Sequence, residues 1–126
     1  MRFFLRKKNR LCTEKEIGTL FTEGTAHFIY PIKLLYLTYS SKEADYKLLV
    51  TVSKRNFKKA VHRNLIKRRI KEAFRMNSFQ ILKSLEGKGK GVNIAFIYVS
   101  RNILDFKEIE DLINRQLLYL SNTLES

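Results

Sequence analysis

The stretch SKRNFKKAVHRNLIKRRIKEAFR, residues 53–75, combines the densest positive charge of the sequence with its clearest helical pattern. It holds ten Lys or Arg residues and one acid, Glu72, and the whole chain carries a formal net charge of +13. Four apolar residues recur in it at helical spacing: Ile66, Ile70, Ala73 and Phe74. This spacing predicts a helix, within a pattern that extends over 56–83, that packs one apolar stripe against a sheet.

A row of basic residues follows a second side of this helix at intervals of four: Arg63, Lys67, Lys71 and Arg75, with Asn64 and Arg68 beside them. Like charges at this spacing destabilise a helix by a few tenths of a kcal/mol per pair. A helix with a purely structural role would include more acids than Glu72 alone. The row therefore favours a phosphate-binding face over a merely solvated one, because each neutralised phosphate releases counterions. A broad face of helix and sheet suits RNA better than duplex DNA.

The composition predicts one folded, basic RNA-binding domain spanning residues 1–126, with residues 1–10 as a basic N-terminal arm. Apolar residues make up 44% of the chain, which excludes a wholly disordered protein. The 25 Lys and Arg against 12 Asp and Glu favour a polyanionic partner, with nucleic acid ahead of an anionic membrane. Cys12 is the only cysteine, so an intrachain disulfide and a cysteine-based zinc site are excluded, and a cytoplasmic location is expected.

Helices are expected at both ends of the chain. A short helix at 14–23 would be opened by a capping box formed by Thr13 and Glu16. Asp105 and Glu108 repeat this signature before a C-terminal helix. No apolar run approaches the ~20 residues that a membrane-spanning helix needs, so no membrane insertion is expected.

Three segments predict strands. Residues 28–39 and 46–52 are rich in aromatic, β-branched and leucine residues, and we expect them to pair as an antiparallel hairpin with Pro31 at a strand start or edge. Residues 92–99 form the third strand. The fold class is therefore α+β, a small sheet with helices covering one face and part of the other face left to solvent.

The residues predict no catalytic or metal site. Three acids cluster near the start of the last helix, where the helix dipole favours negative charge: Glu108, Glu110 and Asp111. His62 has no sequence partner for a general-base role, and nothing pairs with Cys12. The chain is therefore interpreted as a binding protein. The functions considered as alternatives are a ribosomal or other structural RNA-binding protein, a DNA-binding regulator and a membrane-surface protein.

Short motifs in the basic stretch form an ordered pattern: Ser53-Lys54, Ala60-Val61, Arg63-Asn64, Lys67-Arg68 and the run from Lys71 to Arg75. This pattern resembles the signature of the bacterial ribonuclease P protein component, and the similarity covers nearly the whole chain. Three features depart from the family pattern. Leu65 ends a motif that is usually Arg-Asn-Arg, Lys58-Lys59 replace a usual Gly-Asn, and the segment 26–33 is slightly longer than is typical.

The resemblance implies an α/β sandwich of order α-β-β-(β)-α-β-α, with a mixed sheet and a left-handed crossover through the basic helix, although such connections are right-handed as a rule. It implies the protein subunit of an endoribonuclease that removes the 5′ leader of precursor tRNA. The chain would bind the catalytic RNA and the leader, and no protein partner is expected. The catalytic centre and its Mg²⁺ are expected in the RNA, so the chain itself would carry no cofactor and no catalytic residue.

The resemblance also assigns residues to two surfaces. The RNA contacts carried over from the family are Lys54, Arg55, Lys59, Arg63, Asn64, Lys67, Arg68, Lys71 and Arg75. Ile17, Phe21 and Tyr36 are the candidates to line a cleft between the first helix and the sheet that contacts the leader. Packing in the core is the alternative role for Ile17 and Phe21.

Overall fold

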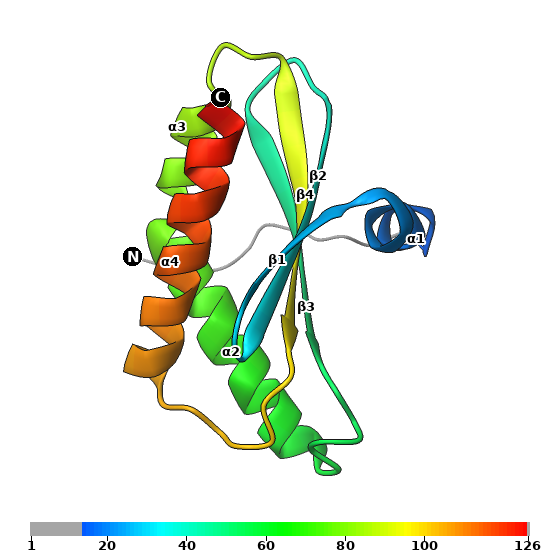
Figure 1. Ribbon diagram of the computed structural model, residues 1–126, viewed down its shortest axis with the longest axis vertical. Helices are drawn as coiled ribbons and strands as arrows, with labels where there is room; N and C mark the ends of the chain where they lie inside the picture. The colour runs from blue at the N-terminus through cyan, green and yellow to red at the C-terminus, as the bar shows by residue number, and fades with distance from the viewer. Residues whose placement is uncertain (1–13, 126) are drawn as a thin grey trace.

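The computed structural model describes residues 14–125, which form four helices and four strands (Figure 1). In chain order these are α1 (Glu14–Glu23), β1 (Thr25–Ile29), β2 (Ile32–Ser40), β3 (Asp45–Val52), α2 (Ala60–Asn77), α3 (Phe79–Leu85), β4 (Lys90–Tyr98) and α4 (Phe106–Glu125). The fold is α+β, as the sequence predicts. The predictions for the basic arm, for Cys12 and for the Thr13 cap lie outside the described residues.

The four strands form one mixed sheet in the order β1-β2-β4-β3. β1 pairs with β2 and β2 with β4 in antiparallel register, whereas β3 runs parallel to β4. The predicted hairpin between 28–39 and 46–52 is therefore wrong, because β4 lies between β2 and β3. The residues of β4 explain its central place: it is apolar on both faces, with Ile94 and Phe96 on one and Ala95 and Ile97 on the other. Such a strand is most stable when it is covered on both sides.

Pro31 divides the predicted first strand into two. Ile29 and Ile32 are paired across the turn Tyr30-Pro31, so Pro31 immediately precedes β2. A proline has no backbone N–H to donate to a ladder, and this place agrees with the expected strand start.

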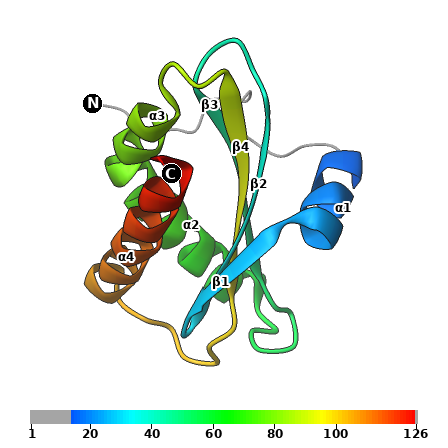
Figure 2. The same cartoon turned by 45° about the horizontal axis from the view of Figure 1, so that its top comes forward.

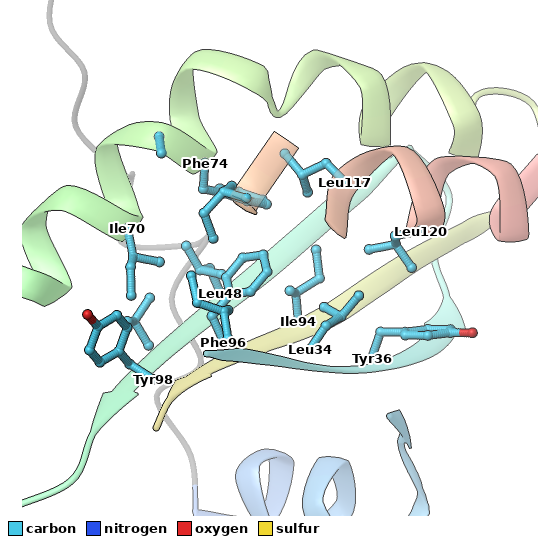
Figure 3. Close-up of a cluster of buried hydrophobic side chains, with 14 of the residues drawn as sticks. Leu34, Tyr36, Leu48, Ile70, Phe74, Ile94, Phe96, Tyr98, Leu117 and Leu120 are labelled. Carbon is cyan, nitrogen blue, oxygen red and sulfur yellow. The ribbon is translucent and has the colours of Figure 1, made fainter. Parts of the chain in front are cut away.

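Three helices cover one face of the sheet and α1 lies on the other (Figures 1 and 2). The expectation that helices cover one face is thus correct for α2, α3 and α4 and wrong for α1. Buried side chains of both layers meet in the main core, as Figure 3 shows for Phe74, Phe96 and Leu117. The cluster under α1 is much smaller and has three buried members among residues 14–125: Leu20, Leu35 and Ala95.

The long helical pattern begins later than predicted and is divided at Ser78. Residues 53–59 form a loop, and α2 begins at Ala60. The Ser78 hydroxyl donates to the Arg75 carbonyl oxygen over 3.2 Å, and such a bond competes with the helical ladder. At the other end of the chain the predicted cap is confirmed, because the Glu108 backbone N–H donates to Asp105 Oδ1 over 2.8 Å.

The connection between the parallel strands β3 and β4 runs through α2 and α3. This is the crossover that the resemblance implies, and its left hand stays a prediction. Since α2 joins two neighbouring strands, its buried side lies over the sheet and its other sides carry the charge.

Candidate nucleic-acid interface

The apolar stripe of α2 is buried as predicted. Ile66, Ile70, Ala73 and Phe74 have no solvent exposure and belong to the main core. The basic side chains occupy the remaining surface of α2 and the loop 53–59 that leads into it. We call this surface the cationic face: Lys54, Arg55, Lys58, Lys59, Arg63, Lys67, Arg68, Lys71 and Arg75.

The cationic face is not buried in the protein. Lys54, Arg55, Lys59 and Arg68 are exposed, as is Asn64, and the basic residues of the four-residue row are half-buried. All nine residues predicted as RNA contacts are therefore brought together on one helix and its preceding loop. That they contact RNA stays a prediction.

The protein's own acids leave much of this charge uncompensated. Within residues 14–125, Lys59, Lys67 and Arg68 form no ion pair with a carboxylate. Glu72 is the only acid in α2, and the first turn of the helix contains none. The N-cap residue Lys59 makes no side-chain capping bond, so the positive end of the helix dipole adds to the same potential. Such a field attracts a polyanion.

Arg63 has a role that the sequence did not predict. Its Nη1 donates to the carbonyl oxygens of Phe57, over 2.7 Å, and of Lys58, over 3.0 Å. Phe57 is itself buried against Tyr98, with the ring centroids 6.2 Å apart. Arg63 therefore holds the loop 53–59 against the start of α2, and the loop in turn presents Lys58 and Lys59 to solvent.

Arg69 is a second basic residue with an internal partner. Its Nη1 donates to the Leu104 carbonyl oxygen over 2.6 Å and ties α2 to the segment before α4. It points away from the four-residue row, since it lies about 160° around the helix from Lys67 at 100° per residue. Spacing along the sequence identifies the row but not the arginines that serve as tethers.

The second candidate surface lies between α1 and the sheet. Ile17 packs against the small cluster of Leu20, Leu35 and Ala95, whereas Phe21 is 45% exposed. Glu16 accepts a 2.6 Å ion-paired hydrogen bond from Lys47 Nζ and so joins α1 to β3. α1 thus carries one apolar side chain packed toward the sheet, Ile17, and one exposed aromatic ring, Phe21.

Tyr36 does not belong to this surface, and its assignment to the leader cleft is wrong. It lies on the opposite side of the sheet with Leu34 and Leu120 in the main core (Figure 3), where its ring meets that of Tyr119. Burial raises its pKa. Side chains alternate along a strand, so a displacement of one residue moves a side chain to the other face. Leu35, and not Tyr36, points toward α1, where it is buried with Leu20 and Ala95.

Two polar residues on the α1 side of the sheet were missed by the sequence reasoning. By alternation, Tyr39 shares this face with Leu35, and Asn93 shares it with Ala95. Tyr39 Oη and Asn93 Oδ1 are both buried without a hydrogen-bond partner in the described part of the chain. Burial, together with the negative charges of Asp45 and Glu16, raises the pKa of Tyr39 to about 12.

Two other features are absent from the described residues. No helix among residues 14–125 is long and apolar enough to cross a membrane. The same residues contain no group of three or more His, Cys, Asp or Glu side chains placed to hold a metal ion.

Comparison with known proteins identifies the family of this chain. The family model for ribonuclease P matches residues 5–119. A ribonuclease P protein component from Porphyromonas gingivalis is 35% identical over 125 residues, covering 98% of this chain and 91% of that protein. The chain belongs to the ribonuclease P protein family. A second ribonuclease P protein component, from strain W83 of the same species, is 34% identical with the same coverage.

Solved structures of ribonuclease P proteins have the same fold. The protein from Thermotoga maritima superposes with a TM-score of 0.65 at 23% identity, covering 84% of this chain and 96% of its own. The protein from Staphylococcus aureus gives a TM-score of 0.64 at 20% identity, with 90% and 94% covered. At this level of identity the likeness establishes the α+β architecture that holds the cationic face.

Proposed function

We propose that this chain is the protein subunit of ribonuclease P and that its cationic face binds the catalytic RNA. The observation that carries the proposal is the set of exposed cations on α2 and loop 53–59, of which Lys59, Lys67 and Arg68 have no carboxylate partner in the described part of the chain. Family membership supports an RNA of the ribonuclease P type over ribosomal RNA. Lysines act as point charges toward phosphates, and the planar fork of Arg68 can engage a phosphate with two bonds.

The second part of the proposal concerns the substrate. The 5′ leader of precursor tRNA would lie beside α1, on Ile17 and Phe21. The partial exposure of Phe21 supports this, because an aromatic ring at the surface of a basic protein can stack on an unpaired base. Binding two polyanions on opposite sides of the sheet would bring RNA and substrate together.

The chain would supply binding and no chemistry. Endonucleolytic removal of the leader would take place in the RNA partner, with Mg²⁺ held mainly by that RNA. The protein's contribution would be electrostatic, since its positive field lowers the repulsion between catalytic RNA and precursor tRNA. Cytoplasmic precursor tRNA would be the substrate pool.

Reconstitution tests this function. The chain is added to in vitro transcribed ribonuclease P RNA from Porphyromonas gingivalis, and 5′ processing of a precursor tRNA is followed at low magnesium concentration. We expect faster cleavage than with RNA alone. No stimulation, together with co-sedimentation of the chain with ribosomal subunits after a salt wash, would instead identify a structural RNA-binding protein.

Charge variants identify the surface. Replacing Lys59, Lys67 and Arg68 together by Ala should leave the fold intact and reduce the slope of log K against log salt by about 2–3, at about 0.7–0.9 per phosphate contact. The matched control removes three exposed lysines from other elements: Lys42, Lys83 and Lys107. It makes the same change in net charge. Equal losses in both variants would show that net charge, and no defined face, binds the RNA.

A further inference from the structure

The outer side of α2 is hollowed next to the cationic face. A surface hollow of about 530 Å³ is lined by Val61, His62, Asn64, Leu65 and Arg68. Asn64 and Arg68 adjoin the basic row, so the hollow continues the cationic face around the helix.

The lining of this hollow is unsuited to phosphate. Val61 and Leu65 are one turn apart and therefore neighbours on the helix surface. Val61 is 67% exposed although it lies among cations. Neither side chain can pair with a charged oxygen, and an apolar pair in this position gains stability only when an apolar surface covers it.

The other three lining residues match the chemistry of an unstacked base. Unpaired bases are held in proteins by stacking on histidine rings and arginine planes and by hydrogen bonds to their edges. His62 and Arg68 supply the two flat groups, and Asn64 supplies both a donor and an acceptor. Within the described residues none of these three side chains has a hydrogen-bonding partner.

We propose that this hollow seats one unpaired nucleobase of the RNA partner. The inference rests on the proposed function and names what that surface recognises besides phosphate. The surrounding charge selects a polyanion: Lys58, Lys59 and Lys67 are all basic neighbours of the hollow in the sequence. A regular duplex would offer only its backbone to this side of a helix, since its bases are stacked inside. A base that has left the stack presents the apolar face that Val61 and Leu65 can cover.

The experiment separates base contact from phosphate contact. RNA affinity is measured over a salt series for the Val61→Ser/Leu65→Ser double variant, for Val61→Ser alone and for Lys67→Ala. Leu118→Ser on α4 is the matched control, because Leu118, like Val61, is an exposed apolar side chain on a helix. Dimethyl sulfate reactivity of the bound RNA is recorded in parallel to find unpaired adenines and cytosines that the protein protects.

We expect the double variant to bind about tenfold more weakly at every salt concentration, with an unchanged salt slope, since a stacked base is worth ~1–3 kcal/mol. At least one base protected by the wild type should regain reactivity, and Leu118→Ser should change nothing. Unchanged affinity, or a loss accompanied by the reduced slope seen for Lys67→Ala, would overturn the base seat while leaving the proposed function in place. If the wild type itself fails to bind the RNA, the proposed function is wrong and the base seat with it.

Leu65 is half-buried, so its substitution could also disturb the packing of α2. If Val61→Ser alone reproduces the loss of affinity, the loss supports the base seat without relying on Leu65. Capture of an acidic protein in place of RNA, abolished by the same variant, would also overturn the seat, because the occupant would then be a peptide surface.

Discussion

The two faces of the sheet differ in how they are covered. In the described part of the chain, the face under α2, α3 and α4 carries the main core, whereas the face under α1 carries a cluster of three buried residues. The layer of α2, α3 and α4 gives stability, so the outer side of α2 can hold a row of repelling charges. On the α1 side Phe21 is partly exposed, and Tyr39 Oη and Asn93 Oδ1 have no hydrogen-bond partner among residues 14–125. The main core and the proposed leader surface thus lie on opposite faces of one sheet.

The largest expected effect contrasts the two cores directly. Phe74→Ala should lower the free energy of unfolding by about 3–5 kcal/mol, because it empties a fully buried position between α2 and the sheet. Leu20→Ala in the α1 cluster should cost less, about 2–3 kcal/mol, since it removes a smaller side chain from a cluster with fewer buried members among the described residues. Urea denaturation of both variants measures the difference. Equal costs would show that the α1 layer is as integral to stability as the helical one.

Phe21→Ala tests the proposed function of the α1 side of the sheet. The side chain is 45% exposed, so the free energy of unfolding should change by less than about 1 kcal/mol. Affinity for leader-bearing precursor tRNA should fall by ~1–3 kcal/mol relative to mature tRNA, as expected for one stacked base. Binding of the two tRNAs to the reconstituted holoenzyme measures this. Equal losses for both would mean that the ring serves packing and not the leader.

A substitution of Arg63 tests whether this residue holds loop 53–59 and its lysines in place at the start of α2. Arg63→Ala removes the two bonds to the carbonyl oxygens of Phe57 and Lys58, and the backbone amides of loop 53–59 should then exchange hydrogen faster. A double-mutant cycle between Arg63→Ala and Lys59→Ala on RNA binding should give a coupling of about 1 kcal/mol. Additive losses of RNA affinity, with unchanged amide hydrogen exchange in loop 53–59, would show instead that Arg63 contacts a phosphate directly.

The smallest effect concerns Tyr39 and alkaline pH. Its pKa is raised from 10.0 to about 12 in the folded chain, so the neutral phenol is favoured by folding. The resulting stability is present below pH 10 and is lost between pH 10 and pH 12. Tyr39→Phe should therefore lose less stability than the wild type over this range, by about 1 kcal/mol after allowance for partial exposure. Parallel pH dependences of urea midpoints would show that burial of the hydroxyl has no such consequence.

Local patterns were sufficient for much of the fold. The stripe containing Ile66 and Phe74 follows from helical spacing, and the Asp105 cap follows from side-chain chemistry within three residues. Both depend on neighbours in the chain, whose geometry the helix itself imposes. The sequence also predicts that the basic residues lie together on one helix, because spacing by four places side chains on one side of it.

The pairing of the strands and the face of the sheet to which a side chain points could not be predicted from local patterns in the same way. The order of β2, β4 and β3 depends on which strand gains most from burial on both faces, and that is a property of the assembled sheet. The misplacement of Tyr36 has a related origin: one residue of register decides between the main core and the α1 side, and the longer segment before β2 left that register open.

By itself the sequence determined that this chain builds an α+β domain with one strongly basic helix, because charge and hydrophobic period are written residue by residue. Only the tertiary structure decided that Arg63 holds a loop, that Tyr36 is core, and that a hollow with Val61 adjoins the cationic face. These facts depend on contacts between residues of different elements or on the shape of the folded surface. No local periodicity encodes such contacts, since they are selected by the packing energy of the whole sheet and its helices.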